Sequence, residues 1–344
     1  VQLRLNDPGV IPGFRAIADS VHPYGAKLIA QLHHAGLRAF PKPGVKIVGP
    51  VDNLSGKVPV YGMTKEDIAD LTAKFAKAAK HAQIAGLDGV ELHAGHGYLF
   101  SQFLSPLTNT RTDEYGGDAA GRARFLLETV QAVRKACGPQ FILSVRLAVR
   151  DWDPKGQPLE DGIEFAKMLD GKVDLINITT GARFGALSNS ETQDKPDGFR
   201  LDLARAVKPH VKKTPVSIVG KLRTGEMCES VIKDGVADLV VVGRQILCDP
   251  EWPNKLGTGR EREVRKCLNC MECYGSVMSL SGIRCAINPY CGFDSVYDEG
   301  NLPRAAKPKK VVVVGGGVTG MQAAVTAAER GHAVTLLEKS PDLG

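Results

Sequence analysis

Six short apolar runs, separated by stretches of helical periodicity, constrain the fold of this 344-residue chain more than any other feature. Near-continuous runs of apolar, β-branched residues are typical of parallel strands buried on both faces. Their alternation with helical stretches predicts repeated βαβ units. In the stretch 65–85, Ile68, Leu71 and Phe75 recur at i, i+3 and i+4 spacing, which predicts an amphipathic helix. The predicted strands are residues 26–32, 89–92, 141–147, 175–179, 216–219 and 239–242.

Residues capable of chemistry follow all six predicted strands. A (β/α)8 barrel places its active site at the C-terminal ends of its strands, and so does an open doubly wound sheet. Because these residues are spread over every strand, the sequence favours an α/β fold of the TIM-barrel type with two of the eight strands missing. The strand-end residues are Gln31, His93, Arg146, Thr179, Gly220 and Gly243.

Charge and cysteine usage exclude several classes of protein. The 44 basic and 38 acidic residues give a net charge of +6, but they are scattered, so we expect no nucleic-acid partner. No apolar run approaches the ~20 residues that span a bilayer, so we expect no membrane partner. Five of the eight cysteines fall between residues 267 and 291, whereas a secreted disulfide framework has cysteines throughout a short chain. We therefore expect a metal or cluster site in a reducing, cytoplasmic compartment.

The clustered cysteines follow the spacing Cys267-x2-Cys270-x2-Cys273-x11-Cys285. Three closely spaced thiolates can wrap one side of a cubane, and a distant fourth can close the cage, so the spacing predicts a 4Fe–4S cluster. The alternatives are a structural zinc site and no metal site. Zinc ribbons use two separate C-x2-C pairs, which this stretch lacks. Cys291 competes with Cys285 as the fourth ligand.

A glycine-rich turn follows the four-valine run 311–314. Gly315, Gly317 and Gly320 match the G-x-G-x-x-G fingerprint between a strand and a helix, where glycines let the backbone approach a pyrophosphate. Glu338 ends the next predicted strand and can accept a hydrogen bond from a ribose hydroxyl. This stretch predicts the start of a Rossmann-like domain that binds FAD or NAD(P)H. We expect that domain to continue beyond Gly344.

Two histidines and a tyrosine follow the predicted strand 89–92. His93 and His96 can donate hydrogen bonds to one carbonyl oxygen, and Tyr98 can deliver a proton. From these residues alone, the alternatives are a pair of metal-binding histidines and histidines with a structural hydrogen-bonding role. The earlier pair His33-His34 is interpreted as structural or pocket-lining.

Other strand ends suggest a flavin and its phosphate. Gly220, Gly243 and Arg244 follow the last two strands, where barrels usually bind phosphate. Arg146 could offset the charge of a reduced flavin, and Gln31 could pair with its pyrimidine edge. A structural hydrogen bond is the alternative role for these last two side chains.

Together these motifs resemble the Old Yellow Enzyme family. The stretch from His93 to Tyr98, the run QFLSP at 102–106 and the run RTDEYGG at 111–117 carry this resemblance. The cysteine cluster and glycine fingerprint narrow it to the multidomain branch of 2,4-dienoyl-CoA, enoate and steroid reductases and trimethylamine dehydrogenase. The resemblance implies an FMN-binding barrel (1–258), an iron–sulfur segment (259–299) and the start of an FAD/NAD(P)-binding domain (300–344). The six strands would be barrel strands three to eight, and the first two would precede Val1.

The resemblance also implies roles for individual residues. Gln31 and Arg146 would contact the FMN ring, and Gly220, Gly243 and Arg244 would hold its phosphate. His93 and His96 would bind the substrate oxygen, and Tyr98 would donate the proton. The expected enzyme is an NAD(P)H-dependent ene-reductase that uses FMN, FAD and a 4Fe–4S cluster.

A small unsaturated carbonyl compound is the expected substrate, and a homo-oligomer is compatible with the sequence. The alternatives are an amine dehydrogenase, which in this branch carries Tyr where this chain has His93, and an inactive cluster-carrying fragment. The segment 180–186 lacks the His expected of a dienoyl-CoA reductase. Arg183 within it could meet a carboxylate or phosphate, or could lie at the surface.

Overall fold

The computed structural model describes residues 3–53, 55, 58–181, 191–296 and 302–344 of the chain. These residues belong to two units, Val1–Val242 and Gly243–Gly344. Arg183 lies outside the described residues.

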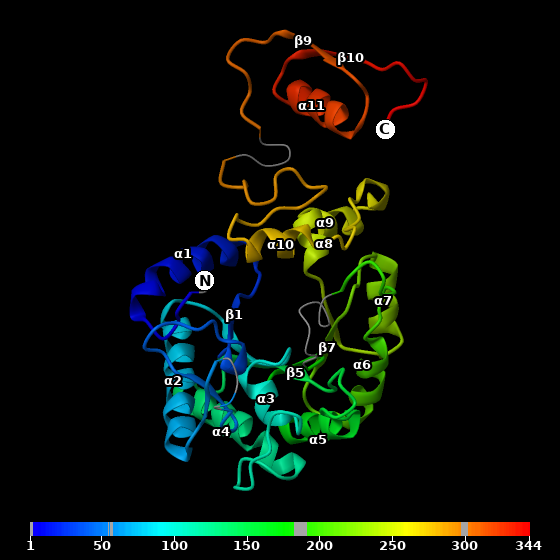
Figure 1. Cartoon of the computed structure of the whole chain (residues 1–344). Helices are drawn as coiled ribbons and strands as arrows, with labels where there is room; N and C mark the ends of the chain where they lie inside the picture. Colours follow the sequence, from blue (N-terminus) through cyan, green and yellow to red (C-terminus); the bar gives the residue numbers. More distant parts are fainter. Residues whose placement is uncertain (1–2, 54, 56–57, 182–190, 297–301) are drawn as a thin grey trace. The chain divides into compact units, whose positions relative to one another are not determined.

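A six-stranded parallel sheet forms the centre of the first unit (Figure 1). Its strand order, β1-β4-β5-β6-β7-β8, follows the order of the chain, as consecutive βαβ units require. All six predicted strands are confirmed, with ends that differ by at most a few residues. They are β1 Ile29–Leu32, β4 Gly89–Ala94, β5 Ile142–Ala148, β6 Leu175–Thr179, β7 Val216–Val219 and β8 Leu239–Val241.

The two faces of this sheet differ in polarity, because alternate residues of a strand point to opposite faces. Leu92 and Val145 are fully buried on the apolar face. Glu91, Ser144 and Asn177 share the other face and are joined there by hydrogen bonds. Helices cover the outer side of the sheet (Figure 1), so the first unit has a TIM-barrel-like α/β fold with a polar interior. The helices are α1 Ile11–Val21, α2 Lys65–Ile84, α3 Leu99–Leu104, α4 Ala119–Cys137, α5 Leu159–Leu169, α6 Leu201–Val207 and α7 Gly225–Lys233.

Helix α2 illustrates how the local sequence sets these elements. Thr64 caps its first turn by accepting from the Asp67 backbone N–H at 3.1 Å, and the Asp67 side chain accepts from the Thr64 N–H at 2.9 Å. This reciprocal capping box satisfies donors that the first turn leaves free. Ile68 and Phe75 are buried, as the helical periodicity predicts.

Strands β1 and β8 are the two edges of the six-stranded sheet, so within the described ranges the sheet does not close into a ring. A separate parallel pair, β2 Ile47–Gly49 and β3 Val60–Gly62, was not predicted.

The second unit begins with the glycine that follows β8 and carries both the cysteine segment and the glycine fingerprint. Its strands β9 and β10 form a parallel pair in which Lys310 lies opposite Ala333 and Val314 opposite Leu337. Helix α11 connects them, which confirms the predicted strand, glycine turn, helix and strand. The elements are α8 Arg244–Cys248, α9 Trp252–Gly257, α10 Glu272–Met278, β9 Lys310–Val314, α11 Val318–Glu329 and β10 Ala333–Leu337.

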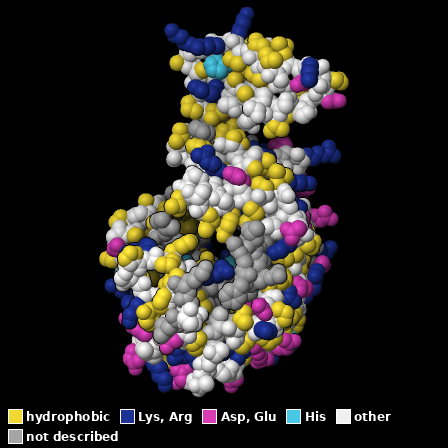
Figure 2. Space-filling model, in the orientation of Figure 1, with side chains coloured by type: hydrophobic (Ala, Val, Ile, Leu, Met, Phe, Trp, Pro, Cys, Tyr) yellow, Lys and Arg dark blue, Asp and Glu magenta, His cyan; other side chains and the backbone are white. Residues whose placement is uncertain are grey.

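Basic and acidic side chains are interspersed over the visible face of the molecule (Figure 2). None of the described helices combines the length and apolarity needed to cross a lipid bilayer.

Candidate functional site

The loop after β4 turns back sharply and brings the predicted His and Tyr side chains together. His96 and Gly97 both adopt left-handed backbone conformations, with φ of 56° and 73°. The His96 N–H donates to the carbonyl oxygen of Thr180 at 3.0 Å, which ties the loop to the end of β6. Tyr98 then occupies the N-cap position of α3 in an extended conformation, and its side chain makes no capping hydrogen bond.

The three rings predicted as one site are neighbours. The ring centroid of His93 lies 4.9 Å from that of His96 and 5.2 Å from that of Tyr98. His33, interpreted from the sequence as structural or pocket-lining, lies 4.7 Å from the Tyr98 ring and 6.3 Å from the His93 ring. The Arg38 guanidinium lies 6.0 Å from the Tyr98 ring centroid. The sequence indicated a place near the site for His33, because this residue follows a predicted strand. No sequence feature indicated one for Arg38.

Burial favours the neutral form of His93 and of His96. Burial lowers the pKa of His93 and of His96 well below 6.5, and the positive charge of Arg146 lowers both further. His96 Nε2 lies 2.8 Å from the Thr179 hydroxyl. His93 Nδ1 is buried and has no hydrogen-bond partner among the described residues. A neutral imidazole has one N–H to donate. His96 can therefore offer its N–H to a further oxygen from Nδ1 when Nε2 accepts from the Thr179 hydroxyl.

Gln31 and Arg146 lie on β1 and β5, the strands on either side of β4. Gln31 is opposite Glu91 and donates to its carboxylate at 2.6 Å, and Arg146 is opposite His93. Buried atoms without partners among the described side chains include Arg146 Nε and Asn177 Oδ1. A buried polar atom without a hydrogen-bond partner destabilises the folded protein unless a ligand supplies that partner. A flavin ring edge, with its alternating N–H and C=O groups, fits this polar strand-end layer.

The predicted phosphate residues fall in different units. Gly220 follows β7 in the first unit, and a Cβ at that position would lie 3.1 Å from the Arg200 side chain. Gly243 and Arg244 begin the second unit, where an Arg244 guanidinium nitrogen lies 2.9 Å from Met271 Sδ. The joint phosphate site therefore stays a prediction.

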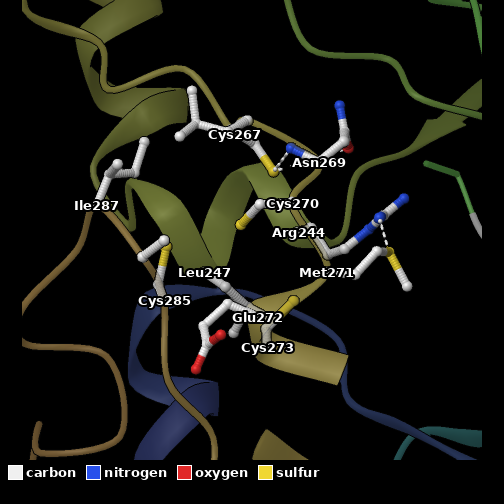
Figure 3. A pocket seen from close by; sticks show the side chains of 12 residues that line it. Arg244, Leu247, Cys267, Asn269, Cys270, Met271, Glu272, Cys273, Cys285 and Ile287 are labelled. Carbon is white, nitrogen blue, oxygen red and sulfur yellow. Dashed lines mark hydrogen bonds between the residues drawn. The ribbon is translucent and has the colours of Figure 1, made fainter. Parts of the chain in front are cut away.

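The four predicted cluster cysteines line one pocket in the second unit (Figure 3). Arg244 lines the same pocket, whereas Cys291 does not. The chain winds around the pocket because Asn269 and Met271 adopt left-handed conformations, with φ of 53° and 66°. The Asn269 N–H also points at the Cys267 sulfur, at 3.4 Å. The lining residues are Arg244, Leu247, Cys267, Leu268, Asn269, Cys270, Met271, Glu272, Cys273, Cys285, Ala286 and Ile287.

These thiols surround the pocket without meeting at one point. Across the described part of the chain, no group of three or more His, Cys, Asp or Glu side chains is arranged to hold a metal ion. Cys248, which lies before the five clustered cysteines in the sequence, is buried. Its burial and the neighbouring Cys285 and Cys267 raise the pKa of its thiol to about 12.

Helix α8 holds the chain segment that leads into the cysteines. The Gln245 side chain donates to the Arg265 carbonyl oxygen at 2.7 Å and accepts from the Cys267 N–H at 2.9 Å. Lys255 and Asp249 form a buried ion pair at 2.9 Å, and Asp249 also accepts from the Arg265 N–H at 3.0 Å. These contacts could not be foreseen from the cysteine spacing.

The glycine fingerprint has the geometry of a dinucleotide turn. Gly315 has φ of 99°, and a Cβ on Gly320 would lie 1.8 Å from the Gly315 carbonyl oxygen. A Cβ on Gly317 would meet nothing within 4 Å, so the approach to the helix N-terminus is open. Glu338 accepts from the backbone N–H groups of Gly316 at 2.5 Å and Ser340 at 2.9 Å, and these bonds lower its pKa. Its predicted role toward a ribose stays a prediction.

Comparison with known proteins places these features in a family. Residues 1–263 match the NADH:flavin oxidoreductase / NADH oxidase family, and residues 259–344 match pyridine nucleotide-disulphide oxidoreductases. The chain belongs to the NADH:flavin oxidoreductase / NADH oxidase family. The resemblance to the multidomain branch of the Old Yellow Enzyme family is thereby confirmed.

Similar proteins in this family include reductases. An NADH oxidase of Thermoanaerobacter brockii is 41% identical over 351 residues, covering 100% of this chain and 53% of the relative. A cinnamate reductase of Clostridium sporogenes is 36% identical over 353 residues, covering 95% of this chain and 52% of the relative. The structure of a 2-naphthoyl-CoA reductase complex matches with a TM-score of 0.90 and 33% identity, over 98% of this chain and 54% of that one. The chain thus spans about half the length of these relatives.

Proposed function

We propose that this chain belongs to an NAD(P)H-dependent ene-reductase that reduces the C=C bond of an α,β-unsaturated carbonyl compound. The cluster of the His93, His96 and Tyr98 rings at the end of β4 carries the proposal. Two neutral imidazoles and a phenol at a buried strand end form a donor set for a substrate oxygen, together with a proton source. The cinnamate reductase among the relatives supports this reaction class.

The chain's own residues would act on the substrate as follows. His93 and His96 donate hydrogen bonds to the carbonyl oxygen, where negative charge develops as the double bond is reduced. Tyr98 gives its phenolic proton to the α-carbon. Gln31 and Arg146 would hold the FMN ring beside this site, and Gly220, at the end of β7, would contribute to holding its phosphate. When bound, FMN supplies the hydride that adds to the β-carbon.

The second unit would supply the route for electrons. Cys267, Cys270, Cys273 and Cys285 would hold a 4Fe–4S cluster, whose four irons each need one ligand. All four cysteines line one pocket, and their spacing lacks the two separate C-x2-C pairs of a zinc ribbon. Gly315, Gly317, Gly320 and Glu338 would hold FAD, which takes electrons from NAD(P)H. The division into 1–258, 259–299 and 300–344, and a cytoplasmic location, belong to the same proposal.

The first test is anaerobic purification of the whole protein, followed by quantitation of flavin, iron and sulfide. We expect two flavins and about four irons per chain. NAD(P)H should bleach the flavin absorbance, and an enone or enoate should restore it. Bleaching by an amine but not by NAD(P)H would contradict reduction and indicate an amine dehydrogenase. Iron and sulfide without flavin would indicate a cluster-carrying scaffold, and zinc without iron would contradict the cluster.

A further inference from the structure

Glu91 is a buried carboxylate at the centre of the polar sheet face, and the proposed mechanism does not use it. Only 8% of its surface is exposed. Three uncharged side chains donate to it, one from each of three other strands: Gln31 at 2.6 Å, Ser144 at 3.0 Å and Asn177 at 3.1 Å. Burial of a carboxylate is costly unless such donors compensate for the lost water. Glu91 lies on the same sheet face as His93, two residues along the strand, and Arg146 is opposite His93, which points to a role in the site.

The contact with Gln31 fixes which way that amide points. A carboxylate only accepts hydrogen bonds, so the Gln31 NH2 group must face Glu91. The amide oxygen of Gln31 is then turned away from Glu91 and remains an acceptor for another N–H. Without the carboxylate, the amide could rotate by half a turn and present its donor group instead.

Glu91 also acts on Arg146 through charge. The two residues lie on neighbouring strands, with Glu91 opposite Ser144 and His93 opposite Arg146 in the register. Burial lowers the pKa of Arg146, and the negative charges of Glu91 and Glu191 act in the opposite direction. Removing the charge of Glu91 would therefore leave the Arg146 cation with less compensation at the strand ends.

We propose that Glu91 is a positioning residue for the flavin site: it locks the Gln31 amide with its oxygen available to the cofactor, and it balances the charge of Arg146. Through these two effects Glu91 sets the reduction potential of the bound FMN. The proposal rests on the FMN site proposed above.

The test is the FMN midpoint potential of the purified holoprotein carrying Glu91→Gln. The substitution keeps the size of the side chain but removes one negative charge beside Arg146. Because the reduced flavin is the more negative form, its relative stability should increase and the potential should shift to more positive values. Glu128→Gln is the matched control. It removes the same charge from a half-buried carboxylate that accepts from Tyr115 at 2.9 Å, and it should leave the potential unchanged.

Two further results would decide the proposal. If Glu91→Gln retains FMN at an unchanged potential, Glu91 has only a structural role and the inference is wrong, although the proposed function stands. If the wild-type protein binds no FMN, the proposed function fails and this inference fails with it.

If Glu91→Gln does not fold, Ser144→Ala is measured in its place. It removes one hydrogen bond that disperses the carboxylate charge, so the potential should shift to more negative values, and an unchanged potential would overturn the inference.

Discussion

At the residue scale, Tyr98 separates the two halves of the proposed reaction. Tyr98→Phe keeps the ring next to His93 and His33 but removes the phenolic proton. We expect alkene reduction to fall by about 10²–10⁴-fold, because a positioned general acid contributes about that much. The rate of flavin reduction by NAD(P)H should not change. Stopped-flow measurement of the two half-reactions checks this.

Tyr61→Phe is the control for this substitution, because Tyr61 is 39% exposed on the short strand β3. It should leave both half-reactions at their wild-type rates. Full alkene reduction by Tyr98→Phe would assign the proton to another group.

The two buried histidines predict a pH dependence of stability. In the unfolded chain, His93 and His96 take up protons near pH 6.5. In the folded chain their pKa values lie well below 6.5, because burial and Arg146 disfavour the charged form. The unfolded state then binds more protons as the pH falls below about 6.5, so the free energy of unfolding should decrease in that range.

Urea unfolding between pH 8 and pH 5 measures this effect. His93→Gln should reduce the loss of stability on acidification, because one of the two groups no longer titrates. His210→Gln, at an exposed position, is the control and should leave the slope as it is. An equal loss in wild type and His93→Gln would assign the acid sensitivity to other groups.

At the scale of elements, the strands and the long helices could be predicted, because burial imposes a repeating pattern on each. The run Leu175–Thr179 was predicted with its observed ends. Strands β2 and β3 escaped prediction because each carries only two apolar residues before a glycine, whereas the equally short β8 lies in a continuous apolar run. The site was predicted where side chains follow one strand, as with His93, His96 and Tyr98. Contacts between residues far apart in the sequence, such as Glu91 with Asn177 or Gln245 with Cys267, leave no local sequence pattern from which they could be predicted.

The glycine turn between β9 and α11 distinguishes a glycine needed for folding from one needed for binding. A Cβ at Gly320 would collide with the Gly315 carbonyl oxygen, so Gly320→Ala should lose both FAD and roughly 1–3 kcal/mol of stability in the second unit. A Cβ at Gly317 meets nothing, so Gly317→Ala should keep the fold and lose only FAD affinity, because the methyl group would obstruct a pyrophosphate.

Thermal unfolding and FAD titration, carried out on both variants, check this distinction. Gly317→Ala serves as the folding control for Gly320→Ala. Equal FAD affinity in Gly317→Ala and wild type would argue against a pyrophosphate at this turn.

At the scale of the whole molecule, the proposed chemistry is divided between the two units. The rings that would bind the substrate belong to Val1–Val242, and the cysteine pocket belongs to Gly243–Gly344. Each site is built from side chains of its own unit: His96 is held by Thr179, and Cys267 by Gln245. Loss of one site should therefore leave the structure of the other intact.

Cys285→Ser tests this division. Cys285 lines the cysteine pocket, so its loss should remove most of the iron and stop alkene reduction driven by NAD(P)H. The ring site does not include Cys285, so the same variant should still reduce the alkene when dithionite supplies the electrons.

Cys291→Ser is the matched control, because Cys291 is buried but does not line the pocket, and it should keep both iron and NAD(P)H-driven activity. If Cys291→Ser loses the iron and Cys285→Ser keeps it, the fourth ligand is Cys291. If Cys285→Ser loses its iron but keeps NAD(P)H-driven turnover, electrons reach the ring site without the cluster, and the second unit has another purpose.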